Sequence, residues 1–266
     1  MKKKVSLILS ALSVIIFITS GCAPKKILDL ALRPLLDPKV VFEKISRPGD
    51  LDAFIKAEAH ITLDSPDRNY SGRVAMAVKK PSSLRVDAIP AFGPADFLLS
   101  ANEKEFKIFI PGRKKFYTGE SSGKNLFRFF GIPLPTDETV SLLTGTPPAI
   151  SGENLRFKGS WEKNLYRIDV TSEGKRIRSI WTGPKGEEMV RIETLNESGT
   201  VLYTAWFDDY TPTGNDTYPK TIKVAMKFPV WALFKVHYSD IEVSSDDDTS
   251  IFNLVPPPGI EPTVID

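Results

Sequence analysis

The fold is decided by residues 125–148, NLFRFFGIPLPTDETVSLLTGTPP, which are helical sequence within a chain that otherwise alternates like β-strands. Asn125 can cap a short apolar helix, and Gly131 provides a left-handed stop for it. A second helix is expected from Thr136 to Gly145, since its first turn is acidic and two prolines follow its end. Two short apolar helices, at about 125–145 in a sheet protein, predict a lid or plug over one concave face of the sheet.

On both sides of these helices, apolar and polar residues alternate with a period of two, as they do in half-buried antiparallel strands. An antiparallel sheet of about a dozen strands must curl, and a helical insert can fill its hollow. We therefore predict a mainly β fold: an open, strongly curved antiparallel half-barrel spanning 50–266, with the helical lid inserted mid-chain. After the lid, strands are expected at 154–159, 165–171, 176–182, 188–195, 201–208, 221–227, 233–243 and 251–254.

The alternation also predicts which side chains face the hollow beneath the lid. Such side chains would suit a flexible apolar guest, because methionine and the aromatic residues adapt to chains of uncertain shape. Plain core packing is the alternative interpretation of the same pattern. The predicted cavity residues of the sheet are Val74, Met76, Val78, Leu84, Val86, Phe97, Leu99, Phe106, Ile108, Ile110 and Phe116. The predicted lid residues are Leu126, Phe127, Phe129, Phe130, Leu142 and Leu143.

The loop Ile89-Pro90-Ala91-Phe92-Gly93-Pro94 is apolar where the tip of a hairpin is normally polar. Its two prolines prevent it from continuing the ladder of either flanking strand. Phe92, with Ile89 second, is therefore a candidate for an apolar finger that touches a membrane or a partner. The alternative is that Phe92 folds back onto the mouth of the sheet as ordinary core.

Residues 1–21 are typical of a signal peptide, because three lysines precede an apolar run that is too short to span a bilayer. Small residues then lead into Cys22, the single cysteine, and this arrangement resembles a bacterial lipobox with Thr19 at the usual aliphatic position. We expect acylation of Cys22, a tether with a short helix at 22–49, and anchoring in the outer membrane, facing the periplasm. Otherwise Cys22 is only a small residue of the signal segment.

The sequence offers little for catalysis or for nucleic acid. Losing the three leader lysines lowers the formal charge of +2 by three, which leaves no basic footprint for nucleic acid. His60 and His237 are the only histidines, and no cysteine pair accompanies them to complete a metal site. Gly119-Glu120-Ser121-Ser122-Gly123 fits the letters of the Gly-x-Ser-x-Gly elbow, but we interpret this stretch as a loop before a helix. We expect no enzymatic activity, no cofactor and no metal; a lipid hydrolase is the least favoured alternative.

Three segments together resemble the LolB family of outer-membrane lipoprotein receptors. FGIPLP at 130–135 and SLLTGTPP at 141–148 are similar to the family's Leu-Gly-Trp-x-Leu-Pro stretch and to its Leu/Trp-rich helix ending in Gly-x-Pro. Ile132 and Leu142 stand where the family has tryptophan. LRVDAIPAFGPADFLL at 84–99 looks like the family's strand, loop and strand, whose tip carries a membrane-directed apolar residue.

The resemblance implies an apolar cavity that accepts the acyl chains of lipoproteins, or another lipid, and helps to insert them into the outer membrane. It also implies a monomer that receives its cargo from a LolA-like periplasmic carrier. The alternative from another class is a non-transporting accessory lipoprotein of envelope assembly, whose apolar groove binds a protein partner.

Overall fold

The computed structural model describes residues 33–47, 54–66, 68–131, 133–214, 216–227, 230–244 and 249–265. Leu35–Asp266 forms one compact unit, which is described here by itself. The predicted signal peptide and Cys22 lie outside the described residues. Three α-helices are described: α2 (Pro38–Ser46), α3 (Gly123–Phe130) and α4 (Thr136–Leu143). In the described ranges, none of the helices has the length and apolar character needed to cross a membrane.

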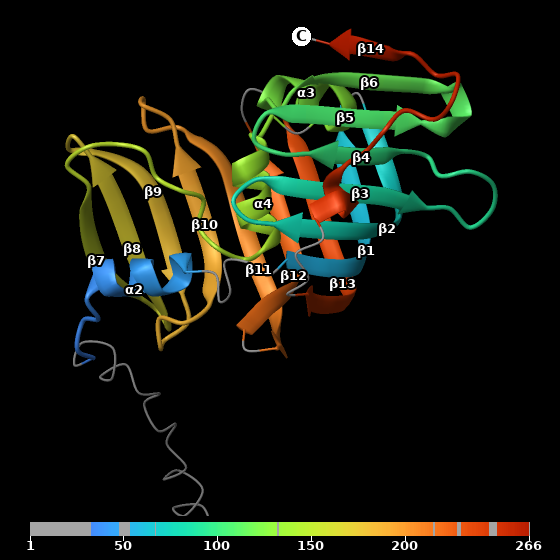
Figure 1. Ribbon diagram of the computed structural model, residues 1–266. Coiled ribbons are helices and arrows are strands. Elements are labelled where there is room, and N and C mark those ends of the chain that lie inside the picture. The colour runs from blue at the N-terminus through green and yellow to red at the C-terminus, as the bar shows by residue number, and fades with distance from the viewer. Residues whose placement is uncertain are drawn as a thin grey trace, which may run out of the picture. The chain divides into compact units, whose positions relative to one another are not determined.

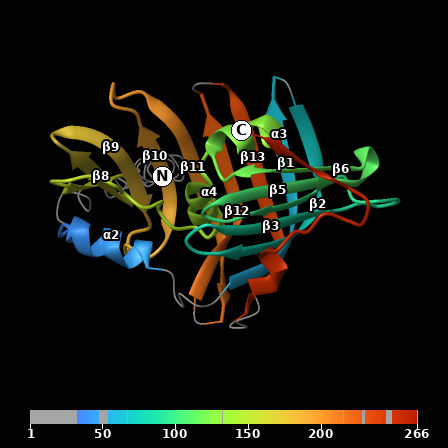
Figure 2. The same ribbon diagram turned by 45° about the horizontal axis from the view of Figure 1, so that its top comes forward.

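One 14-stranded sheet contains every described strand, in the order β14-β6-β5-β4-β3-β2-β1-β13-β12-β11-β10-β9-β8-β7. The sheet is curved and open and does not close into a barrel, which confirms the predicted fold class (Figures 1 and 2). Its strands are β1 (Phe54–Ser65), β2 (Arg68–Lys79), β3 (Ser83–Ile89), β4 (Leu98–Ala101), β5 (Glu105–Ile110), β6 (Lys115–Glu120), β7 (Arg156–Glu162), β8 (Leu165–Ser172), β9 (Lys175–Thr182), β10 (Met189–Leu195), β11 (Val201–Thr213), β12 (Asp216–Met226), β13 (Ala232–Ser244) and β14 (Pro262–Ile265).

The last part of the chain departs from the simple meander. The strand predicted at 251–254 is wrong, because Thr249–Phe252 forms a 3-10 turn instead. Phe252 packs with Phe54 and Ala77 on the face of the sheet opposite to the main core. The chain then continues to β14, which pairs with β6 in parallel.

The register of the strands places the apolar residues of neighbouring strands on one concave face. Met76 of β2 lies opposite Ala57 of β1 and Val86 of β3, and all three are buried. Residues directly opposite each other in antiparallel strands point to the same face. The same phase continues through β12, β11, β10 and β9, where Ile222, Ala205, Ile192 and Ile180 are fully buried. One continuous core therefore lines the concave face.

Helix α3 begins and ends where its flanking residues satisfy the free backbone groups. Ser122 is the N-cap, since its hydroxyl accepts from the backbone N–H of Asn125. Asn125, the predicted cap, instead lies inside the helix and donates from its side chain to the Glu120 carbonyl. Gly131 ends the helix with a left-handed φ of 68°, as predicted. The predicted cap was thus three residues too late, whereas the stop was correct.

Helix α2 packs onto the concave face at the other end of the sheet (Figure 1). The rings of Phe42 and Phe157 are 5.0 Å apart, and the Tyr166 hydroxyl donates to the carbonyl of Leu36. Asp37 caps this helix with its side chain. Consequently the concave face carries two separate covers: α2 near β7, and the pair α3 and α4, of which α4 contacts β2 and β3 and also reaches β11 and β13.

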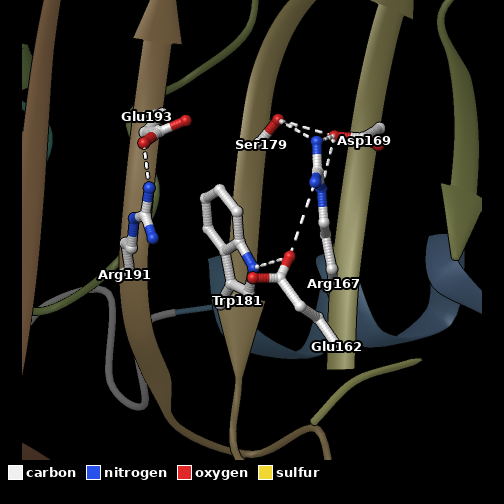
Figure 3. A network of polar contacts seen from close by, with 7 residues as sticks. All are labelled: Glu162, Arg167, Asp169, Ser179, Trp181, Arg191 and Glu193. Carbon is white, nitrogen blue, oxygen red and sulfur yellow. Dashed lines mark hydrogen bonds and ion pairs between the residues drawn. The ribbon is translucent and has the colours of Figure 1, made fainter. Parts of the chain in front are cut away.

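The opposite face of β7 to β10 is polar and satisfies its own charges (Figure 3). Trp181 lies between the guanidinium groups of Arg167 and Arg191, 5.0 Å and 4.2 Å from its ring. Its indole N–H donates to Glu162, and this hydrogen bond, with help from the nearby arginines, holds the pKa of the Glu162 carboxyl below its ordinary value. Asp169 accepts from Arg167 at 2.9 Å. This network of paired charges joins the strands on that face.

Lys80 follows the end of β2 and is half-buried, with its ammonium group donating to the Thr146 hydroxyl. Among the described residues it has no acidic partner within 4.0 Å. Burial lowers the pKa of this amine from 10.5 to about 8. Below pH 8 the fold therefore carries the cost of an unpaired, poorly solvated charge.

The free energy of unfolding should rise as the pH increases from 8 to 10, because the unfolded chain then holds a proton that folded Lys80 has lost. Above pH 10 the buried tyrosines, whose pKa burial raises, oppose this trend. Lys80→Met should abolish this dependence on pH. It should also increase the free energy of unfolding at pH 7 by roughly 2–3 kcal/mol. Urea unfolding at pH 7, 8, 9 and 10 measures both effects, and parallel curves for the two proteins would contradict the assignment to Lys80.

Candidate functional site

A small apolar cavity lies between the sheet and the two lid helices, with a volume of about 60 Å³. None of the surface that lines it is polar. Five of the predicted cavity residues and three of the predicted lid residues border it. The lining residues are Ile61, Met76, Leu84, Val86, Phe97, Leu99, Leu126, Phe130, Thr139, Leu143 and Phe234.

The free space beneath the lid is small. In the measure by which about 10–15 Å³ holds one water, 60 Å³ is room for only about four to six waters. An acyl chain of ordinary length does not fit without movement of the lid or of the side chains below it. Guest binding at this site therefore requires an opening step.

Aromatic side chains form the closure. The rings of Phe97 and Phe130 meet edge to face with their centroids 5.2 Å apart. Tyr70 of β2 packs against Phe97 at 5.6 Å, again edge to face. Such contacts contribute about 0.5–1.5 kcal/mol each beyond the area that they bury. The pair Phe97 and Phe130 is called the aromatic gate below.

A second, larger cavity lies on the other side of the aromatic gate, with a volume of about 430 Å³. Phe97 and Phe130 border both cavities, so the gate is the wall between them. The larger cavity is open to solvent and is called the vestibule below. Its lining residues are Arg68, Asp96, Phe97, Ile108, Ile110, Arg113, Tyr117, Arg128, Phe129, Phe130 and Ile265.

The two lid helices are attached with different strength. In α4, Thr136, Val140, Leu142 and Leu143 are buried, and the carbonyl of Leu143 accepts from the Tyr238 hydroxyl at 3.0 Å. Helix α4 also carries Glu138, which accepts from the buried hydroxyl of Tyr203 and lies 3.8 Å from the buried guanidinium of Arg178. Burial, and then the Glu138 charge, raise the pKa of the Tyr203 hydroxyl. Helix α4 is thus bound to the sheet by buried polar groups.

Helix α3 is attached mainly at its C-terminal end. Only Asn125 and Leu126 of this helix are buried. Arg68 donates to the carbonyl of Phe129 at 2.5 Å, and the Phe129 ring stacks on Phe106 with centroids 5.5 Å apart. The Asn125 side-chain oxygen is buried and has no hydrogen-bond partner among the described residues. Moving α3 therefore breaks fewer buried interactions than moving α4.

The other predicted residues of the sheet fall into two groups. Ile108 and Ile110 line the vestibule, whereas Val74, Val78 and Phe106 belong to the packed core and border neither cavity. In the lid, Leu142 is buried in the same core, Phe129 lines the vestibule, and Phe127 is half-buried. The concave face is therefore mostly filled, and its empty space is concentrated around the aromatic gate.

Phe116 has to be removed from the predicted cavity set. In the pairing of β5 with β6, Ile108 lies opposite Tyr117, and Phe109 lies opposite Phe116. Side chains alternate between faces along a strand, so Phe116 points away from the lid. Its ring lies 6.5 Å from that of Phe109 on the opposite face. Tyr117 occupies the place that was predicted for Phe116.

The apolar loop 90–96 projects from the end of β3, and Phe92 is 96% exposed at its tip. The alternative in which Phe92 folds back as core therefore does not apply to this structure. Ile89 is half-buried at the last pair of β3 with β2, opposite Arg73. Trp231, at the β12–β13 connection, is a second exposed aromatic side chain, at 47%.

Sequence reasoning missed two kinds of residue at this site. Ile61 of β1 and Phe234 of β13 line the cavity. The alternation of the sequence predicts which face of their strands is buried, but it does not predict that the lid lies above these two strands. The arginines of the vestibule come from three separate elements, so no local motif could have revealed them.

His60 and His237 lie opposite each other in the pairing of β1 with β13, and both are exposed. His60 contacts the Ser71 hydroxyl at 3.0 Å, and His237 contacts that of Thr221 at 3.1 Å. Across the described ranges, no group of three or more His, Cys, Asp or Glu residues is placed to hold a metal ion.

An open, curved antiparallel sheet with helices on its concave face is also the fold of solved structures from the LolA superfamily and of related proteins. A LolA superfamily protein from Nitrosomonas europaea is similar in structure, with a TM-score of 0.54 and 14% identity, over 82% of this chain and 98% of that chain. An outer membrane lipoprotein-sorting protein domain from Vibrio parahaemolyticus has a TM-score of 0.54 and 13% identity, over 81% and 95%. A DUF1329 family protein from Desulfovibrio piger has a TM-score of 0.54 and 11% identity, over 82% and 98%. No protein-family model and no curated protein matches the chain.

Proposed function

We propose that this protein is a LolB-like lipoprotein of the outer membrane that binds the acyl chains of lipoproteins and helps to insert them into that membrane. The observation that carries the proposal is the wholly apolar cavity beneath the lid, which opens through two phenylalanines into a larger vestibule. The fold of LolA-superfamily and lipoprotein-sorting proteins supports it. So do the sequence motifs around 84–99 and 130–148 and the lipobox-like segment that ends at Cys22.

Binding requires α3 to move away from the sheet. The guest would replace the contacts that the phenylalanines of α3 make with Phe97 and Phe106, so apolar surface stays covered in both states. Each buried methylene contributes about 0.8 kcal/mol, and a chain of ten would offset the loss of several aromatic contacts. Helix α4 stays in place during this step because its buried polar contacts hold it to the sheet.

Delivery needs a contact with the bilayer, and the loop 90–96 provides the apolar surface for it. Phe92 exposes nearly all of its ring, which costs free energy in water and is recovered in a membrane interface. No catalytic group is required, since acyl chains pass to the bilayer whenever the bilayer holds them more tightly. The cargo would come from a periplasmic carrier of the LolA kind.

The direct test is to purify the full-length acylated protein after mild detergent extraction, exchange it into detergent-free nanodiscs, and transfer to it a lipoprotein held by a LolA-type carrier. Release of the cargo from the carrier and its appearance in the nanodisc bilayer support the proposal. A carrier that keeps its cargo in the presence of the protein contradicts it.

Phe92→Glu should leave the fold intact and reduce delivery at least about tenfold, because a carboxylate at the tip opposes entry into the bilayer interface. Thermal unfolding checks the fold, and the transfer assay checks delivery. Val255→Glu is the matched control, since Val255 is a 63% exposed apolar residue that is not part of the loop. If both variants transfer cargo like the wild type, the loop does not have the role assigned to it.

One observation favours a second function, an accessory lipoprotein that binds a protein partner. The cavity has only about 60 Å³ of free space, and a protein partner bound outside it would need no opening of the lid. Mass spectrometry of the protein isolated from membranes separates the two: a stoichiometric protein with no bound acyl species supports the second function and not the first.

A further inference from the structure

The vestibule combines an apolar floor with a positively charged rim. Arg68, Arg113 and Arg128 line it, and Asp96 is the one acidic residue among its lining residues. These arginines come from the start of β2, the 3-10 turn at Pro111–Arg113 and the helix α3. All three are exposed side chains at the mouth, so the rim has an excess of two positive charges from these four residues.

Two of the three guanidinium groups are free to bind a ligand. Arg68 is engaged with the carbonyl of Phe129. Arg113 and Arg128 make no hydrogen bond or ion pair with any residue in the described part of the chain. Guanidinium groups bind phosphate and carboxylate through two parallel hydrogen bonds, which makes them the preferred partners of such anions.

From the mouth of the vestibule inward, the lining changes from charged to apolar, as an amphiphile changes from its head group to its acyl chain. Exposed arginines come first, then the half-buried Ile110 and Phe129, then the buried Phe97 of the aromatic gate, and finally the apolar cavity. An acyl chain alone would need only the inner parts. We infer that the vestibule binds an anionic head group, a phosphate or a carboxylate, on an amphiphile whose acyl chain passes the gate; this inference rests on the proposed acyl-chain function.

The anion contact also bears on opening. Arg128 belongs to α3, the helix that has to move, and Arg113 belongs to the sheet side of the vestibule. An anion bridging the two guanidinium groups would offset their mutual repulsion and hold α3 in the position that admits the chain. The head group thus contributes selectivity at the mouth, and the chain supplies most of the affinity.

The test is binding of three probes to the full-length protein in nanodiscs of neutral lipid: lysophosphatidylglycerol, lysophosphatidylcholine with the same chain, and glycerol 3-phosphate. Both lysolipids are used at equal and low content, and displacement of a fluorescent fatty-acid reporter is measured. At low salt the anionic lysolipid should bind about five- to twentyfold more tightly than the zwitterionic one, as expected for two exposed charge-assisted contacts. The preference should shrink in high salt.

The double variant Arg113→Gln, Arg128→Gln should lose this preference and keep the wild-type affinity for lysophosphatidylcholine. The matched control is Arg156→Gln, Arg176→Gln, which removes the same charge from exposed positions of β7 and β9 and should keep the preference.

Equal binding of both lysolipids to the wild type, or a preference that survives in the vestibule variant, overturns the inference and leaves the proposed function standing. If neither lysolipid displaces the reporter, the proposed function fails and the inference falls with it. Glycerol 3-phosphate binding as tightly as lysophosphatidylglycerol would show a site for free anions and would also overturn it.

Discussion

Val86→Phe is expected to weaken acyl-chain binding about tenfold or more while leaving the fold as stable as before or slightly more stable. Val86 of β3 borders the cavity from the sheet side, and a phenyl ring there adds about four carbon atoms to a void of about 60 Å³. The first two methylenes of a guest then lose their site, at about 0.8 kcal/mol each, which corresponds to roughly a tenfold change in affinity.

Stability and binding should move in opposite directions at this position. Filling a void commonly adds 0.5–2 kcal/mol of stability, whereas overpacking a filled core costs about 1–3 kcal/mol. Val86→Ala enlarges the void, so it should lower stability by about 1–3 kcal/mol and should not weaken binding. Urea unfolding and displacement of a fluorescent fatty acid measure the two quantities on the same preparations.

Plain core packing makes the contrary prediction for Val86→Phe. If the cavity were only an imperfection of the core, Val86→Phe would change stability without changing lipid binding. A Val86→Phe protein that binds the fluorescent fatty acid like the wild type would therefore show that guests do not enter at this cavity, and the site would have to be sought in the vestibule alone.

The period of two in the sequence predicted the architecture because each strand has one buried face. It predicted Met76, Val86 and Leu99 as lining residues because their phase is unambiguous. It failed at Phe116, where two aromatic residues are adjacent and either phase buries one of them. It also predicted a strand at 251–254, where the chain forms a 3-10 turn. A segment this short, followed by prolines, contains too few residues to establish a period of two.

Two properties of the site lay beyond any pattern in the sequence. The cavity volume depends on how rings such as Phe97 and Phe130 interlock, which is set by side-chain packing and not by polarity. The charged rim depends on arginines from three separate elements, which meet only after the chain has folded. The exposure of Phe92 was predictable only in part. The two prolines of its loop exclude a strand, but they do not determine whether the ring points into solvent or back onto the sheet.

Glu138→Gln is expected to lower the free energy of unfolding by about 3 kcal/mol, the lower end of the range for breaking a buried ion pair. Arg178 is nearly buried, its side chain being 9% exposed, and Glu138 lies 3.8 Å from it. Glutamine can still accept from the Tyr203 hydroxyl, so the variant removes the charge and keeps the hydrogen bond. What remains is a buried guanidinium whose described partner is the carbonyl of Pro148.

The reverse substitution should be milder. Arg178→Met leaves Glu138 with the Tyr203 hydroxyl and with partial access to water, since its side chain is 19% exposed, so a loss of about 1 kcal/mol is expected. It also removes the Arg178 Nε group, which is buried and has no hydrogen-bond partner among the described residues. The double variant should recover most of the stability that Glu138→Gln loses, because no unpaired charge is then buried.

The functional consequence follows from the place of Glu138 on α4. If α4 is the fixed helix of the lid and α3 the moving one, Glu138→Gln should loosen the fixed part and make lipid binding weaker and less dependent on chain length. The melting temperature should fall by roughly 6–12 °C for a loss of 3 kcal/mol. A Glu138→Gln protein as stable as the wild type would show that the Arg178 charge is already hydrated in the folded state. In that case the difference in attachment between α3 and α4, on which the opening step depends, would rest on the contact of Tyr238 with Leu143 and on the larger number of buried side chains in α4.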